Sequence, residues 1–291
     1  MSIRKEDLTI LIPTLNEAGA IGKLIDELKS ENYNILIVDG NSTDGTVEIV
    51  RSKGVRLIFQ EGKGKADAIR TGLKYINTPY LLVMDGDYTY DPKDIEKFLY
   101  PGFDEIIGVR RRDNMEGSHR FGNWLITKVF NVLFGTGLRD VCSGMYLLRT
   151  EVAREVEFRS KGFSVEVEIA AHIASTGGRI GEVEINYRKR IGDPKLRKLH
   201  GISIILSIIR LMLEYNPLFF MFLASSAVLI PGIIIIGYVA FELIFRGINH
   251  HVWALAGISL SGVGYISLLL AVLALYLKRF EYRMMKFMRR S

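Results

Sequence analysis

Two long stretches without a charged residue dominate the C-terminal quarter of this chain of 291 residues. Residues 217–241 form an uncharged run of 25 residues, and residues 252–277 form another of 26. A bilayer core about 30 Å thick is crossed by about 20 helical residues. A water-soluble helix of this length would carry charges on its solvent-facing side. The sequence therefore predicts two membrane-spanning helices, and a buried soluble helix is the weaker interpretation.

The two predicted spans form a hairpin, because only residues 242–251 connect them. Both outer ends of a hairpin lie on the same side of the membrane. Cytoplasmic segments next to membrane spans are enriched in lysine and arginine. We therefore expect a multi-pass protein of the cell membrane, with residues 1–216 and the tail 278–291 in the cytoplasm. The basic residues of the tail are Lys278, Arg279, Arg283, Lys286, Arg289 and Arg290.

The positive net charge of +6 belongs mostly to this membrane region. Residues 1–216 contain 31 basic and 30 acidic residues, whereas residues 217–291 contain 7 basic and 2 acidic residues. A nucleic-acid-binding domain would carry the excess charge on its own surface, so nucleic acid is not an expected partner. The single cysteine, Cys142, excludes a disulfide framework and any site that needs several cysteines.

A basic segment and an amphipathic segment precede the first span. Residues 188–198 contain six basic residues and one acidic residue, and residues 199–215 are mostly apolar. This combination is typical of a helix in the membrane interface, with its basic flank at anionic headgroups; an ordinary core helix is the alternative. The expected organisation is a globular domain at 1–198, an interfacial helix at 199–216, a transmembrane hairpin at 217–277 and a basic tail at 278–291.

Residues 1–190 alternate between short apolar runs and stretches with helical periodicity. Strands that are apolar throughout and alternate with helices indicate a mostly parallel sheet with helices on both faces, so the fold class is α/β. Strands are expected at residues 8–13, 34–39, 55–60, 80–85, 105–109, 145–148 and 181–186. Helices are expected at residues 18–30, 45–53, 65–76, 124–133 and 165–175.

Polar residues stand at the carboxyl ends of three predicted strands. Ligands of open α/β sheets bind beyond this edge, where the carboxyl ends of parallel strands lie together. A site for a cation with an anionic ligand is therefore expected there. The residues are Thr14, Asn16 and Glu17 after the first strand, Asp39 at the end of the second, and Asp85 and Asp87 at the fourth.

The sequence Asp85-Gly86-Asp87 carries the strongest chemical signal. In an extended segment, residues two apart point to the same side, and Gly86 lets the backbone approach a ligand closely. Two carboxylates without a neighbouring cysteine suit Mg²⁺ or Mn²⁺, and such a cation takes its remaining ligands from water and substrate phosphates. Asp85 and Asp87 therefore predict a metal site and a nucleotide-diphosphate substrate, with a solvated acidic loop as the alternative.

Six short motifs stand in a fixed order between residues 7 and 198. They are IPTLNE at 12–17, VDGNSTDGT at 38–46, VMDGDYTYDP at 83–92, CSGMYLLR at 142–149, FSVEVEI at 163–169 and YRKRIGDPKL at 187–196. The set resembles family 2 glycosyltransferases of the GT-A fold. It is most similar to the polyprenyl-phosphate glycosyltransferases, the group of dolichol-phosphate mannose synthase. The resemblance implies a Rossmann-like catalytic domain that inverts the anomeric carbon.

The resemblance also implies roles at the donor side. Pro13, Asn16 and Glu17 would line the nucleotide pocket, and Asp39 would hold the base or the ribose. The segment GKGK at residues 62–65 lacks the spacing of a phosphate-binding loop. It is interpreted either as a neighbour of the nucleotide or as a plain turn.

In the resembling enzymes, Asp85 and Asp87 correspond to the residues that bind the metal bridging the diphosphate, and Asp87 is expected to be catalytic. Relatives often have glutamine two residues after the second aspartate, where this chain has Thr89. A threonine hydroxyl is the weaker metal ligand. Glu166 and Glu168 would lie on the acceptor side of the site, or they are carboxylates at the start of a helix.

Basic residues are expected to meet the phosphates. Arg110 and Arg120 match catalytic positions that face phosphates, and Arg188, Arg190 and Lys195 match the basic stretch at the entry of the lipid phosphate. The family varies by one residue in this stretch, so Arg188 and Arg190 remain alternatives for the catalytic contact. A lipid phosphate is largely ionised near pH 7, since its second pKa is about 6. The reaction therefore needs arginines and a cation to neutralise charge rather than a strong base.

We expect a metal-dependent hexosyltransferase that uses GDP-mannose, UDP-glucose or UDP-N-acetylglucosamine. Its acceptor would be a dolichyl-type polyprenyl phosphate in the bilayer, at the cytoplasmic face. One alternative is a family 2 transferase that acts on a lipid-linked saccharide or another lipid. An alternative of a different class is a membrane scaffold with a degenerate GT-A domain. Within the hairpin, Gly257 and Ser261 form a pair of small residues suited to packing the two spans.

Overall fold

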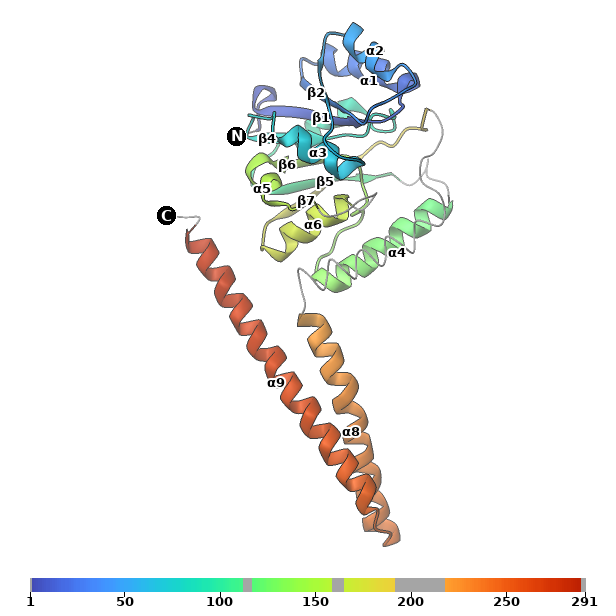
Figure 1. Ribbon diagram of the computed structural model, residues 1–291, viewed down its shortest axis with the longest axis vertical. Coiled ribbons are helices and arrows are strands. Elements are labelled where there is room, and N and C mark those ends of the chain that lie inside the picture. Colours follow the sequence, from blue (N-terminus) through green and yellow to red (C-terminus); the bar gives the residue numbers. More distant parts are fainter. Residues whose placement is uncertain (1, 112–116, 159–164, 192–217, 289–291) are drawn as a thin grey trace. The chain divides into compact units, whose positions relative to one another are not determined.

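The computed structural model describes residues 2–111, 117–158, 165–191 and 218–288. The chain forms two compact units, Met1–Met212 and Leu213–Ser291. The first unit contains an α/β sheet domain, and the second contains a pair of long helices (Figure 1). The predicted interfacial helix at 199–216 lies outside the described residues, and so does Lys195.

The first unit is built around a seven-stranded sheet with the strand order β3-β2-β1-β4-β6-β5-β7. Strands β3, β2, β1 and β4 are parallel, as are β5 and β7, whereas β6 is antiparallel to both of its neighbours. The predicted mostly parallel sheet is therefore confirmed. The strands are β1 (Leu8–Thr14), β2 (Asn34–Asp39), β3 (Arg56–Phe59), β4 (Tyr80–Val83), β5 (Glu105–Arg110), β6 (Tyr146–Arg149) and β7 (Ile180–Ile185).

Helices cover both faces of the sheet (Figure 1). Alternate residues of a strand point to opposite faces, so Ile10 and Ile12 pack with α1 and η2, while Leu11 packs with α3, α5 and α6. The short η2 and α5 were not predicted, because six or seven residues give little periodicity to detect. The helices are η1 (Lys5–Asp7), α1 (Ala18–Ser30), α2 (Thr46–Ser52), α3 (Lys65–Leu73), η2 (Pro92–Phe98), α4 (Gly117–Phe134), α5 (Thr150–Glu155) and α6 (Val165–Ser175).

The strand register brings the predicted polar residues to one edge of the sheet. Thr14, the last residue of β1, pairs with Asp39, the last residue of β2. Strand β4 pairs with the other side of β1 and ends at Val83. Asp85 and Asp87 therefore lie in the turn that follows β4, beside the ends of β1 and β2.

The second unit consists of α8 (Leu218–Arg246) and α9 (His251–Met288), which run in opposite directions (Figure 1). Two segments of 27 residues each, Phe220–Arg246 and His251–Leu277, have mean hydropathies of 2.4 and 2.2. Both are long and apolar enough to cross a membrane. Helix α9 continues beyond the apolar segment, so much of the basic tail is helical.

The two long helices approach closely where their residues are small. A Cβ atom added to Gly232 would lie 2.6 Å from the backbone nitrogen of Ser261 and 3.1 Å from the carbonyl oxygen of Gly257. A Cβ atom added to Gly264 would lie 2.6 Å from the backbone of Leu229. Small residues allow this backbone contact between membrane helices. The predicted packing of Gly257 and Ser261 between the two long helices is confirmed.

Candidate functional site

Asp39 organises the loop that follows β2. Its side chain is fully buried. One carboxylate oxygen, Oδ1, accepts a hydrogen bond of 2.8 Å from the backbone of Ser42, and Oδ2 accepts bonds from the hydroxyls of Ser42 (2.6 Å) and Thr14 (3.0 Å). The residue expected to hold the base or ribose thus holds the protein's own loop in this structure.

The loop after β1 is joined to the loop after β2. Asn16 adopts a φ of 53°, and its side-chain oxygen accepts a hydrogen bond of 2.8 Å from the backbone of Thr43. The backbone N–H of Glu17 donates to the hydroxyl of Thr46 at 2.8 Å. Pro13 lies in β1 opposite Val38 and is half-buried. The predicted nucleotide-side residues are therefore brought together in one pair of connected loops.

Asp87 is held on both carboxylate oxygens. Oδ1 accepts hydrogen bonds from the hydroxyl (2.6 Å) and the backbone N–H (3.1 Å) of Thr89, and Oδ2 lies 3.2 Å from Arg190. Arg190 also donates to Glu17 at 3.1 Å. Burial and the neighbouring Asp85 carboxylate raise the pKa of Asp87 above its ordinary value. Thr89, predicted as a weak metal ligand, here orients the carboxylate of Asp87.

The segment after β7 runs beside the turn that carries Asp87. The N–H of Arg188 donates to the carbonyl of Thr89 at 2.7 Å, and Tyr187 forms a bridge with Tyr90. The two arginines of this segment have different partners. The guanidinium of Arg190 lies next to Asp87 and Glu17.

Arg188 has a different set of partners. Its guanidinium lies 3.2 Å from Glu27 and 2.9 Å from Asp91. The guanidinium also lies over the ring of Tyr88, at 4.5 Å from the centroid. The sequence leaves Arg188 and Arg190 as alternatives for the catalytic contact. Of the two, Arg190 is the one that contacts Asp87.

Asp85 contacts a lysine that sequence reasoning did not assign to the site. The ammonium group of Lys65 lies 2.5 Å from Oδ1 of Asp85 and 2.5 Å from Oε1 of Glu166. Burial alone would lower the pKa of Lys65, but the two carboxylates outweigh it and raise the pKa well above its ordinary value. The signal was present in the GKGK segment, which ends at Lys65, but its partner Glu166 is distant in sequence.

The two aspartates fit a hard divalent cation. Among the described residues, no group of three or more His, Cys, Asp or Glu side chains could hold a metal by itself. Mg²⁺ and Mn²⁺ are commonly bound by one or two carboxylates, with substrate phosphates and water completing the shell. Asp85 and Asp87 provide such a donor set, so a metal here would depend on a phosphate-containing ligand.

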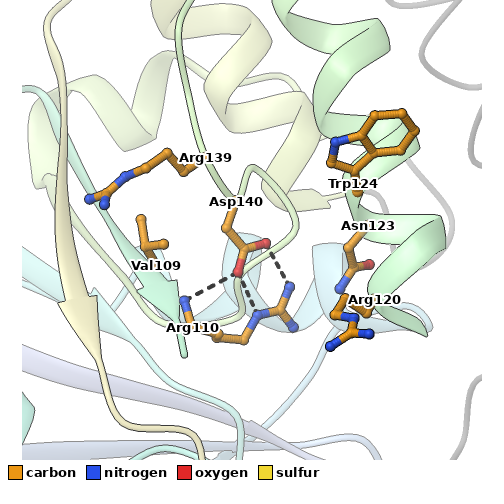
Figure 2. Close-up of a pocket in the computed structure, with 7 residues that line it drawn as sticks. All are labelled: Val109, Arg110, Arg120, Asn123, Trp124, Arg139 and Asp140. Atoms are coloured by element: carbon orange, nitrogen blue, oxygen red, sulfur yellow. Dashed lines mark hydrogen bonds and ion pairs between the residues drawn. The ribbon is translucent and has the colours of Figure 1, made fainter. Parts of the chain in front are cut away.

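Arg110, the last residue of β5, lines a small pocket (Figure 2). Its guanidinium makes two hydrogen bonds of 2.7 Å to Asp140 and is buried. The pocket is also lined by Val109, Arg120, Asn123, Trp124 and Arg139. Arg110, expected to face a phosphate, therefore has its charge paired within the protein, while Arg120 from α4 is exposed. Asp140 was missed because a lone aspartate between predicted elements gives no pattern.

Helix α4 presents apolar side chains on its exposed side. Phe121 is 63% exposed, Trp124 41% and Val132 69%, whereas Ile126 and Phe130 on the other side are buried. The rings of Phe121 and Trp124 lie 5.8 Å apart. The two adjacent aromatic rings make this side of α4 a candidate contact surface. Sequence reasoning predicted only residues 124–133 of this helix and did not identify its exposed side.

Comparison with solved structures shows which proteins share the fold of this domain. The solved structure of glucosyl-3-phosphoglycerate synthase from Mycobacterium tuberculosis, in complex with Mn²⁺, uridine diphosphate and phosphoglyceric acid, is similar with a TM-score of 0.60. The match covers 72% of this chain and 78% of that one, at 19% identity. It shows that the two proteins share the GT-A-type fold.

Sequence comparison gives the family. Residues 9–157 match the family model of glycosyl transferase family 2. The glycosyltransferase AglJ of Haloferax volcanii is 35% identical over 266 residues, which cover 87% of each chain. The dolichyl-phosphate hexose transferase of the same organism is 32% identical over 219 residues, covering 72% of this chain and 95% of the relative. The chain therefore belongs to glycosyl transferase family 2, and the predicted resemblance to its polyprenyl-phosphate enzymes is confirmed.

Proposed function

We propose that this glycosyltransferase moves a hexose from a nucleotide-diphosphate sugar to a dolichyl-type polyprenyl phosphate at the cytoplasmic face of the membrane, with Mg²⁺ or Mn²⁺. The contact of Arg190 with Asp87 and Glu17 carries the proposal. It places a basic residue beside the acidic pair in a chain with two helices apolar enough to span a bilayer. A similar protein bearing the name dolichyl-phosphate hexose transferase supports this acceptor.

The donor would bind at the edge formed by β1, β2 and β4. Asp39 and Asn16 would act on the nucleotide through the connected loops that they order, with Pro13 and Glu17 at the floor of the same region. Asp85 and Asp87 would hold the cation, which supplies positive charge to the leaving diphosphate. Grouping these residues at a strand edge matches the usual position of ligands in open α/β sheets.

The acceptor phosphate would approach from the side of Arg190. The guanidinium group provides planar, charge-assisted hydrogen bonds suited to a phosphate. The exposed Arg120 would contribute further positive charge, while Arg110 stays paired with Asp140. The exposed side of α4, with Phe121 and Trp124, would face the lipid. Lys195, which lies outside the described residues, remains part of the proposed basic entry, whereas Arg188 is paired with Glu27 and Asp91 and would not contact the lipid phosphate.

The proposed reaction needs little acid–base chemistry from the protein. An ionised oxygen of the lipid phosphate attacks C1 of the sugar, and the bond from C1 to the diphosphate breaks as the new C–O bond forms. The nucleoside diphosphate leaves with the bonding electron pair, and attack from the opposite side inverts C1. The residues must hold two negatively charged reactants in line, which is catalysis by positioning and electrostatics.

Full-length protein in proteoliposomes tests the proposal. Radiolabelled GDP-mannose, UDP-glucose and UDP-N-acetylglucosamine are each offered with dolichyl phosphate, with dolichol as the matched acceptor that lacks the phosphate. We expect one donor to label the lipid extract only with dolichyl phosphate, and EDTA to abolish the transfer. Labelling that occurs only when a lipid-linked saccharide replaces dolichyl phosphate in the proteoliposomes would support the alternative acceptor. A protein that neither binds nor consumes any donor would support the scaffold alternative.

A further inference from the structure

The buried Lys65 connects helices α3 and α6 with the turn after β4 that carries Asp85 and Asp87, which we call the acidic turn. Lys65 is the first residue of α3, and Glu166 is the second residue of α6. The ammonium group of Lys65 lies 2.5 Å from a carboxylate oxygen of Glu166 and 2.5 Å from one of Asp85. The Lys65 side chain is only 16% exposed and that of Glu166 only 9%. A lysine is a flexible residue on a surface, but here it is fixed between two charged partners.

The other oxygen of Asp85 is confined by the backbone. Oδ2 lies so close to Gly144 that a Cβ atom at this position would overlap the carboxylate. Gly144 is itself held in place, because its N–H donates a hydrogen bond of 2.7 Å to the hydroxyl of the buried Tyr90. Lys65 on Oδ1 and the backbone of Gly144 beside Oδ2 together fix the orientation of Asp85.

Asp85 and Asp87 are each paired with a different basic side chain. Asp85, Asp87 and Glu166 lie near enough to interact electrostatically, and like charges in a buried site repel one another. Arg190 neutralises Asp87, whereas Lys65 is shared by Asp85 and Glu166. Lys65 therefore stabilises the close approach of α6 to the acidic turn.

Resting on the proposed function, we propose that Lys65 is a positioning residue, which links Asp85 to Glu166 and so holds Asp85 in the orientation that the donor diphosphate requires. Glu166 acts as the anchor of Lys65. This role differs from the acceptor-side role that the sequence resemblance implies for Glu166. The pairing couples the start of α6 to donor binding.

Nucleotide binding measures this role separately from transfer. Full-length protein in detergent is titrated by calorimetry with UDP and with GDP, each in the presence of Mn²⁺. We expect Lys65→Met to weaken binding of the preferred nucleotide about tenfold or more, as expected when a charge-assisted hydrogen bond that orients a ligand-binding group is lost. Lys65→Arg keeps the charge and restores most of the affinity. Lys74→Met, at the end of the same helix, removes only an exposed pair with Glu61 and leaves binding unchanged.

A double variant keeps the test decisive if Lys65→Met unfolds. Lys65→Met with Glu166→Met removes the buried carboxylate together with its cation, so the pair leaves no unpaired charge at α6. The double variant should melt as a folded protein and still bind the nucleotide about tenfold more weakly than the wild type. A folded double variant with wild-type affinity would overturn the positioning role alone. Failure of the wild type to bind either nucleotide would overturn the proposed function as well.

Discussion

Arg190 lies 3.2 Å from the carboxylate of Asp87, although the two residues belong to distant parts of the chain. The contact arises because the segment after β7 hydrogen-bonds along the turn after β4: the N–H of Ile191 donates to the carbonyl of Asp87 at 3.4 Å. Two residues earlier, Arg188 turns away to Glu27. Neighbouring arginines in one basic motif are therefore predicted to have different effects.

The first prediction concerns this difference. Arg190→Ala should lower kcat/KM for the lipid acceptor by roughly 10- to 100-fold, because a charge-assisted hydrogen bond worth about 1.5–3 kcal/mol is lost. Arg188→Ala is the matched control and should keep most of the acceptor kinetics, since its partners are Glu27 and Asp91. Steady-state kinetics with dolichyl phosphate measure both variants. Equal losses in the two variants would contradict the assignment.

The second prediction concerns the metal. Asp87→Asn keeps the shape of the side chain and removes its charge, so it should abolish transfer and strongly weaken Mn²⁺-dependent nucleotide binding. Thr89→Val removes only the hydroxyl that donates to Asp87 and should have a smaller effect, about tenfold or less. Calorimetry with Mn²⁺ and nucleotide compares the variants. Activity that survives in Asp87→Asn, or in EDTA, would show that the proposed metal role is wrong.

Much of the fold could be predicted because its signals are local. Apolar strands such as β1 and β2 alternate with helices such as α1, which indicates a parallel sheet, and polar residues at strand ends indicate the site. The direction of β6 could not be predicted. Its residues 146–149 are an apolar run ending in an arginine, and a strand buried in a sheet reads the same whether its neighbours are parallel or antiparallel.

The contacts within the site depend on pairings between distant segments. The sequence identifies Asp87 and a basic motif, but the contact between Arg190 and Asp87 depends on the pairing between residues 187–191 and 87–90. Lys65 was left between two interpretations because its partner Glu166 lies on another helix. Such contacts have no periodic signature in a single sequence.

The third prediction is a pH dependence of stability caused by Glu105. This residue at the start of β5 is 1% exposed, and within the described part of the chain its Oε2 atom has no hydrogen-bond partner. Burial, with a smaller contribution from Glu166, raises the pKa of Glu105 well above its ordinary value. The folded state therefore keeps the proton where the unfolded chain, with a pKa of about 4.3, loses it. Stability is full below that value and falls as pH rises toward the folded pKa.

Glu105→Gln removes this titration and should be more stable than the wild type at neutral pH. The difference in unfolding free energy should vanish below about pH 4 and grow by up to about 1.4 kcal/mol per pH unit above the unfolded pKa. Thermal unfolding between pH 4 and pH 8 measures it, with the exposed Glu96→Gln as control. A difference that is the same at every pH would mean that packing, not ionisation, accounts for the change.

The fourth prediction concerns topology. The basic tail and the domain before the hairpin should both be cytoplasmic, and the short connection between α8 and α9 should face the opposite side. In a Cys142→Ser background, Ser291→Cys reports on the tail and Asn249→Cys on the connection. A membrane-impermeant maleimide applied to intact cells should label only Asn249→Cys. Labelling of Ser291→Cys from outside would reverse the orientation.

The last prediction concerns the exposed side of α4. Phe121, Trp124 and Val132 are exposed there, and aromatic residues on a helix with exposed apolar surface favour the membrane interface. The chain contains two tryptophans, so Trp253→Phe leaves Trp124 as the single fluorophore. In proteoliposomes, lipids brominated near the headgroup should quench the fluorescence of Trp124. Iodide in the aqueous phase should quench the folded protein less than the protein unfolded in urea, where Trp124 is exposed to water. Trp124→Phe retains Trp253, which lies next to the connection between α8 and α9, and gives the reference for a tryptophan at the other end of the predicted spans. Strong iodide quenching without quenching by brominated lipid would show that this side of α4 faces water.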